Sequence, residues 1–122
     1  MNIKEYLLDV LKNKEIIDLL PNKKVYFLHA SSTKDNPLKK PYLEYEIINE
    51  FGCEYSEGNE DFTSYIVQVD IFSTGDYTEL ENIVKKYMIN NGFNRDMGAD
   101  LYEKDTQLYH KAMRFNISLP AD

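Results

Sequence analysis

The hydrophobic positions at the start of the chain follow a helical period. Five apolar side chains recur at intervals of three and four residues, which places them on one face of an α-helix: Ile3, Tyr6, Leu7, Val10 and Leu11. Ile17 and Leu20 continue the stripe loosely, and Pro21 is expected to end the helix because proline cannot donate the next helical hydrogen bond. The pattern therefore predicts one N-terminal helix that stops before Pro21.

Alternating positions then predict strands. KVYFLH (24–29) is a candidate strand, and the Ser-, Asn-, Lys- and Pro-rich segment 30–41 is a loop. In PYLEYEIINEF the apolar set Leu43, Tyr45 and Ile47 falls on one side of the pleat, and the acids fall on the other, namely Glu44, Glu46 and Glu50. This strand is expected to bury one face and to present an acidic one.

The segment SYIVQVDIFS predicts the next strand. One face carries Tyr65, Val67, Val69 and Ile71, and the other combines Gln68 and Asp70 with two apolar side chains, Ile66 and Phe72. This second face is mixed, so it resembles neither a core nor an ordinary solvated surface.

An amphipathic helix follows at once. Asp76 is a good N-cap, and Glu79 three residues later can return the hydrogen bond. The core-facing stripe is Leu80, Ile83, Val84, Tyr87 and Met88. Asn91-Gly92 supplies a left-handed C-terminal stop.

The C-terminal segment predicts two more strands: a short one around 101–103, a turn at 104–106, and a longer strand that ends at Leu119 with Met113, Phe115 and Ile117 facing inward. The expected fold is α+β, an antiparallel β-sheet with two helices packed on one face, in the order α-β-β-β-α-β-β. At 122 residues, the whole chain 1–122 is expected to be a single domain.

The composition of the chain bears on the cellular compartment in which the protein is expected. No apolar run approaches the length of a membrane span, and the N-terminus carries acids within its apolar period, unlike a signal peptide. Cys53 is the only cysteine, so an intrachain disulfide and a thiolate metal cluster are both excluded. We expect a cytoplasmic protein.

The negative charge is concentrated in one block. The net charge is -7, yet residues 1–40 carry +3 (eight Lys, five acids) and residues 85–122 carry +1 (six basic residues, five acids), whereas residues 41–84 hold eleven acids and no Lys or Arg. Binding to nucleic acid depends on basic side chains that displace counterions from phosphates. This block repels phosphate, so specific binding to nucleic acid is not expected.

Candidate chemistry is sparse. His29 and His110 lie far apart in sequence, and each is interpreted as a packed or hydrogen-bonded residue. The acidic run EFGCEYSEGNED (50–61) could hold Ca²⁺ but lacks the spacing of a calcium loop, so we interpret it as a solvated hairpin loop. STGD (73–76) lacks the glycines and lysine of a phosphate-binding loop. We expect no catalytic site, no cofactor and no metal.

The order of these segments resembles the tail completion and tail terminator proteins of long-tailed phages and prophages. The resemblance rests on KVYFLHA, PYLEYEII, SYIVQVDIFSTGDYTELENIVKKYM, Gly92 and the closing DLYEKDTQLYHKAMRFNISL, and it covers nearly the whole chain in order. These are structural phrases and not catalytic signatures, so the resemblance carries no catalytic residue over.

The resemblance implies a ring, usually a hexamer, at the head-proximal end of the tail tube. Its implied partners are other copies of the chain, the major tail tube protein and the head-tail connector or stopper. The protein would be found in the host cytoplasm during assembly and then in the virion. The acids expected to line the channel or an interface are Glu44, Glu46, Asp70, Glu50, Glu54, Glu57, Glu60 and Asp61.

Three alternatives remain open at this point. Another neck protein, a stopper or head-tail adaptor, has a similar size. An acidic domain could also mimic nucleic acid and occupy the basic groove of a host protein. An undetected hydrolase is the third, and it would require an apolar pocket with two convergent titratable groups.

Overall fold

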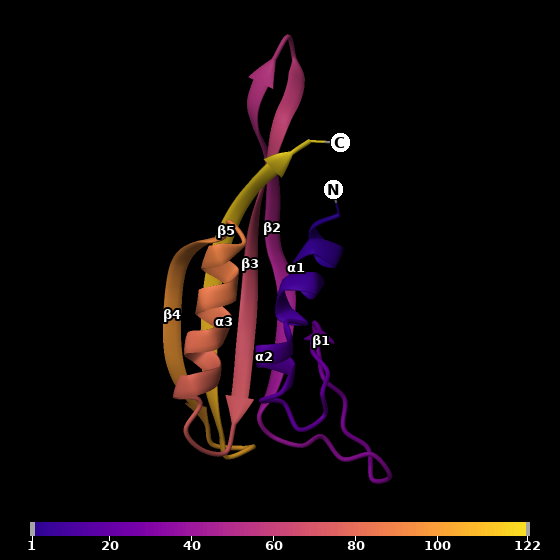
Figure 1. Cartoon of the computed structure of the whole chain (residues 1–122), viewed down its shortest axis with the longest axis vertical. Helices are drawn as coiled ribbons and strands as arrows, with labels where there is room; N and C mark the ends of the chain where they lie inside the picture. The colour runs from indigo at the N-terminus through magenta and orange to yellow at the C-terminus, as the bar shows by residue number, and fades with distance from the viewer. Residues whose placement is uncertain (1, 122) are drawn as a thin grey trace.

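One five-stranded sheet forms the body of the chain, and the computed structural model describes residues 2–121. The strands lie in the order β1 (Tyr26–Phe27), β2 (Tyr42–Ser56), β3 (Asn59–Ser73), β5 (Leu108–Pro120) and β4 (Asn94–Glu103). Three helices cover one face of the sheet (Figure 1), namely α1 (Ile3–Leu11), α2 (Lys14–Ile17) and α3 (Thr78–Asn90). The prediction of an α+β fold is confirmed. The sheet is mixed and not purely antiparallel, because β1 pairs with β2 in parallel.

The predicted N-terminal helix is divided in two. Asn2 caps α1, because its side chain accepts hydrogen bonds from the amides of Lys4 and Glu5. Asn13 then caps α2 by accepting a hydrogen bond from the Glu15 amide at 3.0 Å. The prediction of a single helix toward Leu20 was therefore wrong, because the side chain of Asn13 competes with the helical backbone and starts a new helix.

The predicted strand 24–29 shrinks to the two residues of β1. Lys23 and Leu28 both have positive φ, 55° and 65°, and this backbone conformation ends extended structure on either side. Residues 30–41 form the predicted loop. As a result, β1 covers only the start of β2, and the rest of that strand edge has no strand beside it in the described chain.

The core lies between the helices and the covered face of the sheet, which we call the inner face. Each predicted inward set of β2, β3 and β5 contributes to it, and its largest fully buried side chains include Phe93, Phe115, Leu7, Leu11, Leu43, Ile71, Met88 and Met113. From α3, the buried residues are Leu80, Val84 and Met88, with Ile83 and Tyr87 packed at the margin. The predicted stripe of this helix is confirmed.

The two ends of α3 follow the prediction in part. Asp76 accepts a hydrogen bond from the Thr78 amide at 2.9 Å, although the N-cap position itself is Tyr77. At the other end Gly92 has φ of 91°, and the Phe93 amide donates to the carbonyl of Met88 at 3.1 Å. This is a Schellman stop, and it turns Phe93 directly into the core.

The strand predicted at 101–103 is the end of a ten-residue strand, β4. None of the residues of β4 is buried. Its sequence accordingly does not need, and does not show, the apolar alternation that identified the other strands. Pairing with β5 holds it in the sheet as the outermost strand.

Candidate functional site

Two predicted acids meet on the face of the sheet that the helices leave uncovered, which we call the outer face. Glu44 in β2 and Asp70 in β3 are direct partners in the antiparallel register. Their relative exposures are only 9% and 6%. The expectation that β2 presents Glu44 on an acidic outer face was therefore wrong, because segments distant in sequence cover the carboxylates of Glu44 and Asp70.

Glu44 is covered by the segment that follows β1. Its carboxylate accepts a hydrogen bond from the Ala30 amide at 2.7 Å, and the Nδ1 atom of His29 lies 3.6 Å away. Burial raises the pKa of Glu44 above its usual value, while the Ala30 amide acts in the opposite direction. The start of the loop 30–41 is thereby tied to the sheet.

Asp70 is covered from the other side by β5. The Nε2 atom of His110 lies 2.7 Å from the Asp70 carboxylate, and the imidazole stacks on Phe72 with ring centroids 4.2 Å apart. Phe72 in turn stacks on Tyr42 at 4.9 Å, so three rings cross three strands. The hydrogen bond to Asp70 raises the pKa of His110, whereas burial of the imidazole lowers it.

The same network continues along the outer face. Gln68 donates to Asp70 at 2.9 Å and accepts a hydrogen bond from the Nε atom of Arg114 at 2.9 Å. Among the described residues, each buried side-chain nitrogen and oxygen has a hydrogen-bond partner. A buried polar network that is fully satisfied rigidifies and specifies a fold.

The pair Asp70–His110 resembles the acid and base of a catalytic triad, and its strand neighbours are apolar. The cross-strand neighbours of His110 are Phe72 in β3 and Leu101 in β4, and neither carries a nucleophile. In a catalytic triad the base is hydrogen-bonded to a nucleophile as well as to the orienting acid, and the cross-strand positions beside His110 do not supply one. We interpret this network as a structural one that fixes β2, β3 and β5 to one another.

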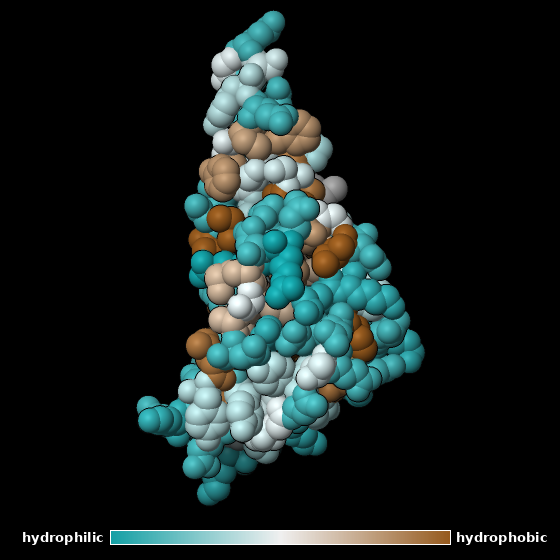
Figure 2. Space-filling model, turned by 90° about the vertical axis from the view of Figure 1, so that its left-hand side faces the viewer, coloured by the Kyte–Doolittle hydropathy of each residue, from teal (hydrophilic) through white to brown (hydrophobic). Residues whose placement is uncertain are grey.

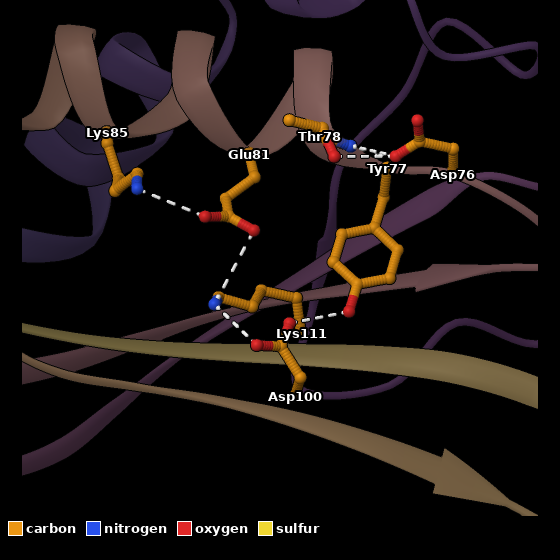
Figure 3. A network of polar contacts seen from close by, with 7 residues as sticks. All are labelled: Asp76, Tyr77, Thr78, Glu81, Lys85, Asp100 and Lys111. Carbon is orange, nitrogen blue, oxygen red and sulfur yellow. Dashed lines mark hydrogen bonds and ion pairs between the residues drawn. The ribbon is translucent and has the colours of Figure 1, made fainter.

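A second polar cluster lies on the inner face, beneath the first turns of α3 (Figure 3). The buried amine of Lys111 lies 3.5 Å from Glu81 and 3.2 Å from Asp100, and Lys85 binds the other oxygen of Glu81 at 3.0 Å. Tyr77 donates to Asp100 at 2.5 Å, which raises the pKa of Tyr77 to about 12. The cluster joins α3 to β4 and β5.

The acidic run 50–61 is a hairpin, as predicted, but it consists almost entirely of paired strands and not of a loop. β2 and β3 continue past the end of their partner strand, and only Glu57 and Gly58 separate them. Both turn residues have positive φ, 53° and 80°, the geometry of a tight hairpin turn. Figure 1 shows this hairpin projecting beyond the helices, and we use the name arm for residues 53–61.

The predicted acids are thus divided among three places. Glu44, Asp70 and the half-buried Glu46 share the outer face. Glu50 does not join them, because Ile48 is an extra residue in a β-bulge and Glu50 pairs with the inner-face residue Tyr65. The remaining acids are exposed on the arm, namely Glu54, Glu57, Glu60 and Asp61.

Sequence reasoning missed the roles of His110, Arg114 and Lys111. The alternation of β5 places His110 and Arg114 on the side of the strand opposite Met113, but only the register shows which acids they meet. Lys111 falls on the apolar side of β5 between Tyr109 and Met113. A lysine at an inward-facing position of a strand indicates that an acidic side chain lies beside it in the folded chain, and this was the available signal for Lys111.

Neither a metal cluster nor a membrane-spanning helix occurs in the part of the chain that the structure describes. Residues 2–121 contain no group of three or more His, Cys, Asp or Glu side chains placed to share an ion. Within the same residues, none of the helices has the length and apolar character needed to cross a bilayer. A scan against protein-family models and a search of curated proteins found no match for this chain.

Proposed function

We propose that this chain is a structural protein of the head-tail junction of a long-tailed phage or prophage. It would cap the head-proximal end of the tail tube as a ring, expected to be a hexamer, and complete the tail for joining to the head. Its partners would be other copies of itself, the major tail tube protein and the connector or stopper. It would assemble in the host cytoplasm and remain in the virion.

The observation that carries the proposal is the projecting arm on a sheet with open edges. The arm extends past the helices (Figure 1). Its residue Tyr55 has an exposed fraction of 65%. Among the residues that the structure describes, β4 ends the sheet on one side, and beyond β1 no strand pairs with the edge of β2 on the other. Such features are typical of a subunit that completes its contacts in an assembly.

The distribution of charge supports a position beside the DNA channel. The arm acids and Glu46 lie within the block that holds eleven acids and no Lys or Arg. An acidic wall repels phosphate, so DNA could pass without binding. Because Glu44 and Asp70 are buried in the network, we assign the channel or interface role to the exposed acids and leave those two residues with a role in folding.

The proposal is tested by removing the gene from the phage or prophage that carries it. We expect tails of irregular length that fail to join heads, and normal tails when the chain is supplied from a plasmid. Joined, infectious particles in the absence of the gene would overturn the proposal.

The second candidate is a mimic of nucleic acid, and the acidic arm is the observation that favours it. A mimic would bind a basic host protein tightly and release it at high salt. Recovery of such a complex, together with normal tails in the deletion strain, would favour this candidate. We assign the Asp70–His110 pair to folding and propose no enzymatic role for it, since the cross-strand neighbours of His110 are the apolar residues Phe72 and Leu101.

A further inference from the structure

An apolar groove with a basic rim opens beside the N-terminal helices. Its floor is formed by Leu8 of α1, Ile17 of α2 and the segment around β1, with Val25 and Phe27. The charged residues that line it are Lys12, Lys23 and Lys24, all of them exposed. A concave apolar floor with charges of one sign at its rim suits an apolar side chain carried on a segment of the opposite charge.

The arm has these properties. Its charged residues are all acidic, namely Glu54, Glu57, Glu60 and Asp61. It also exposes Tyr55, and Phe51 at its base is 49% exposed. Exposed aromatic side chains are effective anchors, because they bury a large area at little entropic cost.

The arm cannot reach the groove of its own chain. Tyr45 borders the groove, and Tyr55 lies ten positions further along the same strand. At about 3.3 Å per residue this is a separation of roughly 30 Å along a straight strand. Figure 1 accordingly shows the arm and the helix α2 at well-separated levels, and Figure 2 shows the body tapering toward the arm.

We infer that the arm of one copy docks in the groove of a second copy, with Tyr55 or Phe51 on the apolar floor and the arm acids against the three lysines. The two surfaces differ, so the contact is head-to-tail. A row of copies joined in this way has a free arm at one end and a free groove at the other. Contacts of this kind either close into a ring or continue as a filament. The inference rests on the proposed function for its setting in the phage tail.

A charge exchange tests the electrostatic half of the contact. One variant carries Lys in place of three arm acids, a second carries Glu in place of the three groove lysines, and a third carries both sets. The positions are Glu54, Glu57 and Glu60 on the arm and Lys12, Lys23 and Lys24 at the groove. We expect the first two variants to lose self-association by about tenfold or more and the third to regain it, because only like-charged surfaces repel.

Sedimentation over a wide concentration range measures the association of each variant. A matched control reverses Lys34, Lys39 and Lys40, which lie in the loop 30–41 and outside the groove, and its association should equal that of wild type. Equal losses in the control and in the groove variant, or no recovery in the third variant, would argue against the pairing of arm and groove.

A spin-label experiment locates the contact even when association is weak. Cys53 is changed to Ser so that a nitroxide can be attached to the single new thiol of Ser56→Cys, beside the turn of the arm. This labelled chain, without isotopes, is mixed with isotope-labelled wild type. We expect broadening of the amide signals of Leu8, Ile17 and Val25. Broadening confined to other surfaces, or none at the highest soluble concentration, would overturn the inference.

The phage assay separates this inference from the proposed function. If the charge-exchanged third variant restores tail completion and the single-sided variants do not, both stand. If the spin label finds the groove but the deletion strain makes normal tails, the contact stands and the proposed function fails. If deletion abolishes tail completion while the single-sided variants complete tails normally, the proposed function stands and the arm contact is overturned.

Discussion

Glu44 and Asp70 lie directly opposite each other on the outer face of the sheet, and each carboxylate is bound by a different segment of the chain. The Ala30 amide binds Glu44 at 2.7 Å, and His110 lies 2.7 Å from Asp70. The charge of Asp70 adds to the cost of ionising the buried Glu44, whereas the His110 imidazolium offsets it. The stability of this face therefore depends on pH.

Stability is expected to decrease as the pH rises through the neutral range. The pKa of His110 is raised from its usual value of 6.5 by the hydrogen bond to Asp70, with smaller support from Glu103 and Glu44. A group whose pKa is higher in the folded state stabilises the fold fully below the unfolded pKa, and the effect is lost as the pH rises through the folded pKa. The pKa of Glu44 is also raised, so this residue acts in the same direction from pH 4.5 upward.

Urea unfolding of wild type and His110→Gln at several pH values measures this effect. We expect the free energy of unfolding of wild type to fall as the pH rises above the ordinary histidine pKa of 6.5, because the pKa of His110 is raised in the folded state, and the variant to show a smaller slope. His29→Gln is the comparison: its native side chain lies 3.6 Å from Glu44 but is 84% exposed, so we expect it to change the slope less than His110→Gln does. Equal slopes for wild type and His110→Gln would contradict the assignment.

Charge reversal on the outer face is expected to distinguish the buried Asp70 from the half-buried Glu46. Asp70→Lys places a cation beside His110 and removes the acceptor of Gln68, so we expect a loss of more than about 3 kcal/mol in unfolding free energy. Glu46→Lys, on the same face but half-buried, is expected to cost less than about 1 kcal/mol. Thermal and urea unfolding measure both, and similar losses would refute the distinction.

Lys111→Met is expected to weaken the junction between α3 and the β4–β5 pair. The change keeps the apolar stem but leaves Asp100 and Glu81 without their shared cation, so we expect a cost of about 2 kcal/mol. Lys104→Met, at an exposed turn position, is the matched control. Hydrogen exchange of the α3 amides measures the local effect, and unchanged protection would argue that the cluster does not hold the helix.

Gly92→Ala is expected to destabilise the fold by about 1–2 kcal/mol, because an alanine is strained at φ of 91°. Steric contact does not add to this cost, since a Cβ atom there would lie 3.6 Å from the nearest atom of Ile117, an ordinary distance. Gly75→Ala is the control, because a Cβ atom at that glycine would have no neighbour within 4 Å. Its unfolding free energy should stay within about 0.5 kcal/mol of wild type. Urea unfolding compares the two variants, and equal losses would contradict the backbone explanation.

Periodicity predicted the elements whose side chains face the core. The inward sets of β2, β3 and β5, the stripe of α3 and the stop at Gly92 all follow from local spacing, and the structure confirms them. Periodicity did not predict the elements whose bounds depend on polar side chains or on backbone geometry. β4 has no buried alternation, Asn13 restarts the N-terminal helix, and β1 is limited by positive φ at Lys23 and Leu28.

The sequence by itself determined which residues are acidic, where the block of acids begins and ends, and which side of β2, β3 and β5 is apolar. Only the tertiary structure decided what those acids do. The bulge at Ile48 turns Glu50 to the inner face, and the register of β5 brings His110 to Asp70 and Lys111 to Glu81, acids that are distant in sequence. The reason is physical: alternation is local, whereas the partner of a charge depends on strand register and on which distant segment excludes water from it.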